Sequence, residues 1–295
     1  MKKTSQEGYI DVTGGKVWYK ACGLDKSQTP LIILHGGPGA SHYYLDCLEA
    51  LACDRPVIFY DQLGCGNSDR PKDKTLWTIE YFTEELDQIR SKLGLKYLHI
   101  LGQSWGTMVA VDYMLTRKHA GIISLILSSP CLSVSRWHGD CRRLISGVSQ
   151  ADKKIILDCE ASRNFGLPQF EAAMTAFYRK HLCRLWPWPE CVAKTFQDMN
   201  RDLYEYMWGP SEFTITGTLK NYERLDQLKN LKIPTLFTCG SFDEATPEST
   251  GEYNRNMPNS ELVVFENASH MHHIEQPQAY IDTMKSFLSR NSSCA

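Results

Sequence analysis

The residues with the clearest chemical potential lie in the segment 102–106, which reads Gly-Gln-Ser-Trp-Gly. The segment follows a short apolar run and precedes residues with helical spacing, so we expect a tight turn from a strand into a helix. Such a turn holds the serine in a strained conformation and exposes its hydroxyl, and the two glycines remove side chains that would collide. In this context the G-x-S-x-G pattern indicates a serine nucleophile, Ser104.

A serine hydroxyl is a poor nucleophile at neutral pH unless a histidine accepts its proton and a carboxylate orients that histidine. Where the serine occupies this kind of turn, the acid and then the histidine follow it in the chain, each just past a strand. Asp243 comes directly after one apolar run, and His270 follows the next. We therefore expect a catalytic triad of Ser104, Asp243 and His270. His273 is the alternative base, and otherwise His272 and His273 are expected to face solvent or to begin a helix.

The glycine-rich segment 35–39, His-Gly-Gly-Pro-Gly, follows the first buried apolar run of the chain. A tetrahedral intermediate needs two N–H donors directed at its oxyanion, and a loop in this place commonly supplies one of them. We assign one donor to the N–H of Gly37 and the other to the N–H of Trp105, at the start of a helix. The chain contains no G-x-x-x-x-G-K-[ST] pattern, which disfavours a phosphate-binding role for the glycines.

Six short apolar runs have the length and the flanking turn residues of buried strands. They are residues 31–34, 56–60, 97–101, 122–127, 235–238 and 262–265. Helical spacing separates several of them, for example over 77–93. Continuous apolar strands that alternate with helices predict an α/β fold, with a mostly parallel sheet and helices on both of its faces. Residues 9–12 and 17–21 predict an antiparallel hairpin at one edge of that sheet.

The alternation stops between about residues 131 and 230, where the pattern is helical and rich in aromatic residues. The sequence Trp-Pro-Trp-Pro at 186–189 predicts a non-helical interruption within this stretch. We therefore expect one core built from residues 1–130 and 231–295, with residues 131–230 inserted into it as a helical cap.

The overall composition narrows the possible partners. The 295 residues are 42% hydrophobic and 22% charged, with a formal net charge of -2. This balance gives no electrostatic reason to expect nucleic acid or an anionic membrane as a partner, and no apolar run approaches the roughly 20 residues that span a bilayer. The N-terminal residues lack the apolar segment of a signal peptide, and Cys294 is not placed for prenylation. The eleven cysteines include no C-x-x-C pair, so we expect reduced, mostly buried thiols in a cytoplasmic protein, without a metal site.

Three segments together resemble the proline iminopeptidase family of α/β-hydrolases. They are 35–39, 102–106 and 61–68, which reads Asp-Gln-Leu-Gly-Cys-Gly-Asn-Ser. The resemblance extends over essentially the whole chain. The segment 209–217, Gly-Pro-Ser-Glu-Phe-Thr-Ile-Thr-Gly, is similar to the tricorn-interacting aminopeptidase and L-amino acid amidase branch. The resemblance implies the α/β-hydrolase fold, no cofactor, and release of an N-terminal amino acid from short peptides, amides or arylamides through an acyl-enzyme.

The resemblance also implies acidic residues that hold the free amine of the substrate, at the positions of Glu212 and Glu244. An α-ammonium is largely charged at pH 7 and needs carboxylate partners inside a desolvated pocket. Without the resemblance, each glutamate would be interpreted as a solvated surface charge. Gln103 departs from the Gly-Gly-Ser-Trp-Gly of many family members, which leaves open whether proline or another apolar residue is preferred. An amino-acid amidase or carboxylesterase on the same triad, or a non-catalytic ligand-binding protein, are the alternatives, and the oligomeric state is left open.

Overall fold

The computed structural model of the chain describes residues 5–117 and 119–292. Cys294 and the N-terminal Lys2 and Lys3 lie outside these residues. Across the described ranges, no helix combines the length and the apolar character that crossing a membrane requires.

The described residues form strands and helices in an alternating order. The strands are β1 (Ser5–Val12), β2 (Gly15–Cys22), β3 (Leu31–Leu34), β4 (Val57–Tyr60), β5 (Leu98–Gln103), β6 (Ile122–Ser128), β7 (Thr235–Gly240) and β8 (Ser260–Phe265). The α-helices are α1 (Ile79–Lys92), α2 (Trp105–Thr116), α3 (Val134–Ile145), α4 (Gln150–Ser162), α5 (Pro168–His181), α6 (Glu190–Gln197), α7 (Arg201–Met207), α8 (Pro247–Asn256), α9 (His272–Glu275) and α10 (Pro277–Arg290). Short 3-10 helices are η1 (His42–Cys53), η2 (Lys74–Leu76), η3 (Thr218–Asn221) and η4 (Leu225–Asn230).

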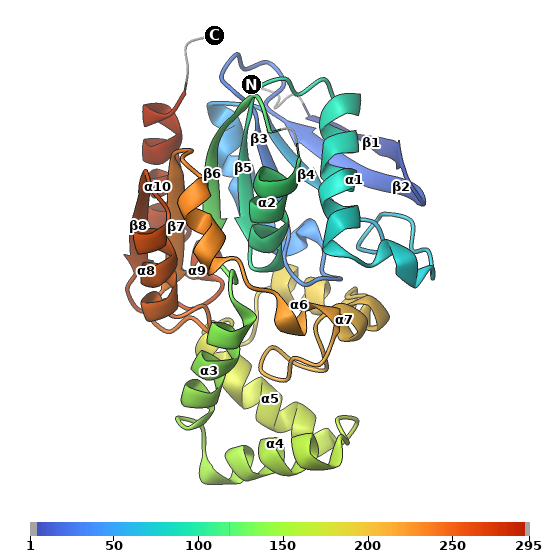
Figure 1. Ribbon diagram of the computed structural model, residues 1–295, viewed down its shortest axis with the longest axis vertical. Helices are drawn as coiled ribbons and strands as arrows, with labels where there is room; N and C mark the ends of the chain where they lie inside the picture. The colour runs from blue at the N-terminus through green and yellow to red at the C-terminus, as the bar shows by residue number, and fades with distance from the viewer. Residues whose placement is uncertain (1–4, 118, 293–295) are drawn as a thin grey trace.

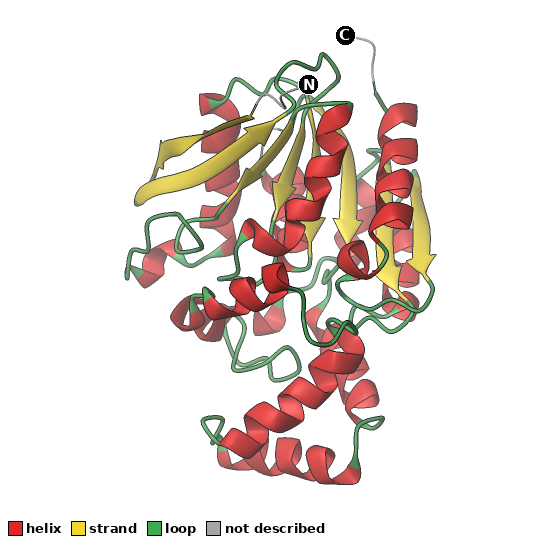
Figure 2. Ribbon diagram, turned by 180° about the vertical axis from the view of Figure 1, so that it is seen from behind, coloured by secondary structure: helices red, strands yellow, loops and turns green. Residues whose placement is uncertain are grey.

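The strands form one sheet in the order β1-β2-β4-β3-β5-β6-β7-β8. Strands β3 to β8 run parallel to one another, whereas β1 and β2 form an antiparallel hairpin that pairs with β4. Every residue of β3, β4 and β5 is buried, because α1 and α2 cover one face of the sheet while η1 and α10 cover the other (Figure 1, Figure 2). The predicted α/β fold, parallel sheet and edge hairpin are confirmed.

Helices α3 to α7 lie between β6 and β7, beyond the carboxyl ends of the parallel strands (Figure 1, Figure 2). The segment 186–189 separates α5 from α6. The chain returns from this region through a buried contact with α2, where Asp112 accepts hydrogen bonds from the Arg224 guanidinium at 2.8 Å and from the Tyr222 hydroxyl at 2.6 Å. We call residues 131–230 the cap. Its helices lie over the end of the sheet where the candidate residues are found.

Candidate active site

Ser104 occupies the sharp turn between β5 and α2. Its backbone has φ 54° and ψ -121°, a region that residues with a side chain rarely enter and that stores strain. The turn is crowded on both sides of the serine. A Cβ atom on Gly102 would lie 2.3 Å from the Gly106 carbonyl oxygen, and a Cβ atom on Gly106 would lie 2.2 Å from that of Leu34. Only glycine fits at these two positions, so the strained serine turn expected from the motif is present at the carboxyl end of β5.

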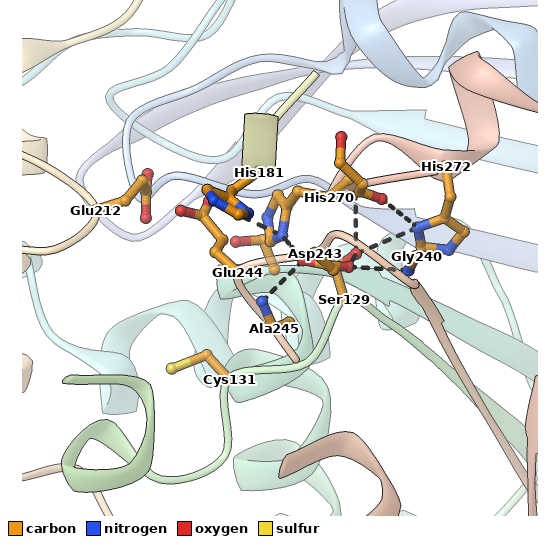
Figure 3. A network of polar contacts seen from close by, with 12 residues as sticks. Ser129, Cys131, His181, Glu212, Gly240, Asp243, Glu244, Ala245, His270 and His272 are labelled. Carbon is orange, nitrogen blue, oxygen red and sulfur yellow. Dashed lines mark hydrogen bonds and ion pairs between the residues drawn. The ribbon is translucent and has the colours of Figure 1, made fainter. Parts of the chain in front are cut away.

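Asp243 and His270 meet where the loops after β7 and β8 approach each other. His270 Nδ1 lies 2.8 Å from Asp243 Oδ1, and both side chains are buried. Because an ionised carboxylate can only accept a hydrogen bond, this contact places a proton on Nδ1 and leaves Nε2 of the neutral ring as the basic nitrogen. The Ala245 N–H donates to Asp243 at 2.8 Å, and the Ser129 hydroxyl donates to it at 2.7 Å (Figure 3). The aspartate is therefore held in a fixed orientation toward the imidazole.

The two rival histidines occupy a different environment. His272 and His273 begin α9, as one reading of the sequence allowed, but they are buried and do not face solvent. His272 Nε2 contacts the Thr238 hydroxyl at 3.0 Å, and His273 Nε2 contacts the carbonyl oxygen of Tyr44 at 3.2 Å. Burial lowers the pKa of both imidazoles, that of His272 to about 4. Of these three histidines only His270 has a hydrogen-bonded carboxylate partner, which favours it as the base.

Ser104 lines a cavity of about 10 Å³ beneath the cap. Its other lining residues are Gly37, Trp105, Met108, Cys131, Trp137, Trp208 and Glu212. Both assigned oxyanion donors lie beside the serine, because Gly37 and Trp105 line the same cavity as Ser104. Gly37 has φ 113°, and Trp105 is the first residue of α2. A larger hollow of about 500 Å³ is lined by residues between Asp87 and Gly121, but no residue of the expected triad contributes to it.

Both candidate amine-binding glutamates lie at this site. Glu244 is fully buried, and neither of its carboxylate oxygens has a hydrogen-bond partner among the described residues. Its Oε1 lies 3.9 Å from His270 Nδ1, and Figure 3 shows its side chain in the same cluster as the imidazole. Glu212, which is partly buried, reaches the site from the cap and accepts a hydrogen bond from the Tyr204 hydroxyl at 2.8 Å. The interpretation as solvated surface charges is therefore wrong for Glu244.

Burial raises the pKa of both carboxyl groups. The negative charges of Glu212 and Asp243 raise the pKa of Glu244 further, whereas the nearby His270 opposes the rise at Glu212. Buried acids that lack hydrogen-bond donors are costly to ionise, and a bound cation with several N–H donors would relieve that cost. Glu244 is the acid without a donor, and an ammonium group placed between it and Glu212 would supply one. Within residues 5–117 and 119–292, no group of three or more His, Cys, Asp or Glu side chains is arranged to hold a metal ion.

Sequence reasoning missed several residues that shape the site. Ser129 has φ 49° and directs its hydroxyl to Asp243. It directly follows β6, so the rule that polar residues just past a buried strand gather at one sheet edge could have found it. Met108, Cys131 and Trp137 complete the cavity wall, but nothing in their types or spacing distinguishes them from ordinary core residues.

Comparison with known proteins agrees with this geometry. The family model described as alpha/beta hydrolase fold matches residues 29–277. The chain is 48% identical to a proline iminopeptidase of Heyndrickxia coagulans, over 96% of this chain and 98% of the relative. It is 39% identical to one of Saccharolobus solfataricus, over 96% and 92% of the two chains.

Solved structures give the same result. The crystal structure of VinJ matches with a TM-score of 0.93 and 33% identity, covering 97% of this chain and 99% of that one. The proline iminopeptidase of Mycobacterium smegmatis matches with a TM-score of 0.89 and 31% identity, covering 97% and 98%. The strained serine and the histidine–aspartate pair both follow parallel strands of this sheet. Together with sequence similarity along nearly the full length, this shows that the chain belongs to the proline iminopeptidase family of α/β-hydrolases.

Proposed function

We propose that the protein is a serine aminopeptidase that releases an N-terminal amino acid, proline or another apolar residue, from short peptides, amides or arylamides. The observation that carries this proposal is the hydrogen-bonded pair of His270 and Asp243 at the carboxyl edge of the sheet that also presents the strained Ser104, with the buried Glu244 and the partly buried Glu212 at the same site. The relatives named proline iminopeptidase support the same activity.

In the proposed reaction, Ser104 Oγ attacks the carbonyl carbon of the N-terminal residue while His270 Nε2 takes its proton. Asp243 stabilises the imidazolium that forms, and the N–H groups of Gly37 and Trp105 bind the oxyanion. The tetrahedral intermediate collapses as His270 gives the proton to the leaving amine, which leaves an acyl-enzyme on Ser104. A water molecule, deprotonated by His270, then releases the amino acid.

The selectivity for a free N-terminus comes from the acids. Glu212 approaches from the cap and Glu244 from the core, so an α-ammonium between them is bound from both sides. An N-acetyl group would remove the positive charge and leave both carboxylates unpaired, which costs more than the lost attraction alone. The aromatic walls formed by Trp137 and Trp208 suit a compact apolar side chain.

We infer that the reaction takes place in the cytoplasm on small substrates. Seven of the ten described cysteines are buried, as expected of small apolar thiols in a chain that folds in a reducing compartment.

The decisive experiment replaces the nucleophile. Ser104→Ala is expected to lower the kcat for an unblocked aminoacyl-arylamide by more than about 10⁴-fold, because the oxyanion donors and binding residues alone supply only a small part of the acceleration. Ser124→Ala is the matched control, since Ser124 is a buried serine of β6 that bonds His99 Nδ1 at 2.7 Å, away from the site. Turnover retained by pure Ser104→Ala protein refutes the proposal.

A substrate panel tests the amine requirement and the side-chain preference together. Pro, Leu, Ala and Phe arylamides are compared with their N-acetyl counterparts and with simple esters. Equal turnover of blocked and unblocked substrates would favour a carboxylesterase and would remove the role of the two glutamates.

A further inference from the structure

The side chain of Gln103 lies between the segments that carry the proposed machinery. Gln103 is the last residue of β5 and directly precedes Ser104, and its side chain is buried. Its Oε1 accepts a hydrogen bond from the Tyr44 hydroxyl at 2.6 Å, and its Nε2 donates to the carbonyl oxygen of His270 at 3.4 Å. A primary amide carries an acceptor and a donor on one planar group, so a single side chain contacts both partners.

Tyr44 extends this contact to the glycine-rich loop. Its hydroxyl accepts a hydrogen bond from the Gly36 N–H at 2.7 Å while it donates its own proton to Gln103. Burial raises the pKa of Tyr44, so the hydroxyl remains a donor throughout the working pH range. A Cβ atom on Gly36 would lie 2.7 Å from Gln103 Oε1 and 3.1 Å from the Cβ of Ser104. The loop that precedes Gly37 therefore packs directly on the Gln103 amide and on the nucleophile.

The loop after β8, which carries His270, also contacts Gln103 and Tyr44. The carbonyl oxygen of His270 also lies 2.9 Å from the Ser129 hydroxyl oxygen, whose single proton it shares with Asp243. The carbonyl oxygen of Tyr44 contacts His273 Nε2 at 3.2 Å, and the Tyr44 and His273 rings lie 5.6 Å apart. Gln103 and Tyr44 thus connect three segments: strand β5 before the serine, the glycine-rich loop 35–39 (the oxyanion loop), and the loop after β8 that carries His270 (the histidine loop). Neither side chain lines the cavity beside Ser104.

We propose that Gln103 and Tyr44 are positioning residues that hold the Gly36-Gly37 loop and the His270 loop in register with Ser104. The inference rests on the proposed function, because it concerns the alignment of the oxyanion donor and the base. Misplacement of such groups by about 1 Å costs on the order of 100-fold in rate. The hydrogen bonds of both side chains go to Gly36, to the His270 carbonyl and to each other rather than to Glu212 or Glu244, so we expect the pair to act mainly on the transition state.

The test compares Gln103→Met and Tyr44→Phe with the parent enzyme on one unblocked arylamide. Each variant removes the hydrogen bonds and keeps a similar volume. We expect kcat to fall at least about 10-fold while KM changes less than about 2-fold, the signature of an interaction made in the transition state. Fluorophosphonate titration of Ser104 counts the competent sites, so kcat refers to folded enzyme only.

An inhibitor pair separates alignment from simple loss of structure. An amino aldehyde forms a tetrahedral adduct with Ser104, whereas the free amino acid product occupies the same pocket without an oxyanion. The variants are expected to lose aldehyde affinity by the same factor as kcat and to keep product affinity. The double variant should lose no more than the more damaged single variant, because residues that act as one unit are not additive. Ser124→Ala, which removes one buried hydrogen bond elsewhere in the sheet, should retain kcat.

Three results would overturn the inference: unchanged kcat in both variants, equal losses of aldehyde and product affinity, or additive losses in the double variant. Its failure is distinguishable from failure of the proposed function. If Ser104→Ala is inactive and the Gln103 and Tyr44 variants are fully active, only the positioning role is wrong. If Ser104→Ala retains turnover, the proposed function itself is wrong.

Discussion

Glu244 combines features that a protein seldom tolerates in one residue. Its carboxylate is fully buried without a hydrogen-bond partner, close to His270 and next in sequence to Asp243. A buried acid left in this condition costs free energy of folding. A bound ammonium group would offset this cost, because it would supply the opposite charge and the hydrogen-bond donors that Glu244 lacks.

Glu244→Gln is expected to lower kcat/KM for an unblocked arylamide by about 10- to 100-fold, mainly through KM. The substitution keeps the shape but removes a charge-assisted hydrogen bond, which is worth about 1.5–3 kcal/mol. Steady-state kinetics measure the change. Glu248→Gln is the control, since Glu248 lies nearby on α8 with its side chain 76% exposed, and it should leave KM unaltered. An unchanged KM in Glu244→Gln would show that the amine binds elsewhere.

The sequence predicts where single residues lie in the fold when a strict geometric rule applies. Ser104, Asp243 and His270 all follow strands, and parallel strands bring their carboxyl ends to one edge of the sheet. The positioning role that we propose for Gln103 and Tyr44 had no such signal, because it depends on a hydrogen bond between side chains 59 residues apart in the chain. Glu212 and Glu244 were predicted through family resemblance alone, since nothing in their spacing reveals that the cap brings Glu212 to the core site that holds Glu244.

At the scale of elements, strands and their order along the chain were predictable from apolar runs, and the boundaries moved by only a few residues. The helix predicted over 77–93 is α1, Ile79–Lys92, and begins where the Thr78 hydroxyl accepts a hydrogen bond from the Tyr81 N–H at 3.2 Å. The burial of α9 was not predictable. Phe265 stacks on His272 with ring centroids 5.1 Å apart, a contact that depends on how the loop after β8 folds back.

One contact between elements has a pH dependence that can be measured. Glu85 of α1 is fully buried, and its Oε2 accepts a hydrogen bond from the Leu63 N–H at 2.9 Å, which fixes the loop after β4. Its Oε1 has no partner among the described residues, and burial raises its pKa to about 8. In the unfolded chain this carboxyl loses its proton near pH 4.5. Between these two pH values the folded state holds one proton more than the unfolded state, so stability falls as pH rises.

Glu85→Gln is expected to lack this dependence. The free energy of unfolding of the variant, relative to the parent, should increase by about 1.4 kcal/mol per pH unit between roughly pH 5 and 8 and then level off. Urea denaturation across that pH range measures it. Glu84→Gln on the same helix is the control, because the Glu84 side chain is 48% exposed. A constant difference between Glu85→Gln and the parent would contradict the elevated pKa.

At the scale of the whole molecule, the cap is hydrogen-bonded to the loops on both sides of the site. The carbonyl oxygen of His181 accepts a hydrogen bond from the His270 N–H at 3.1 Å, so the end of α5 is fixed to the histidine loop. On the other side, the Asn200 N–H donates to the Gly39 carbonyl at 2.9 Å, next to the oxyanion loop, and the Asn200 side-chain amide donates to the Gly64 carbonyl at 2.9 Å. The space left beside Ser104 is about 10 Å³, roughly what one water molecule requires.

An aminoacyl group is many times larger than this space, so we expect the cap to open before a substrate enters. We expect the Ser104→Ala variant, mixed with an unblocked arylamide in a stopped-flow instrument, to show a change in tryptophan fluorescence, because Trp105, Trp137 and Trp208 all line the cavity. The observed rate should saturate at high substrate concentration, since entry is then limited by opening. Trp208→Phe in the same background should reduce the amplitude and keep the saturating rate. A rate that rises linearly with concentration would mean that the closed arrangement does not limit entry, and that the side chains around Ser104 yield to the substrate without movement of the cap.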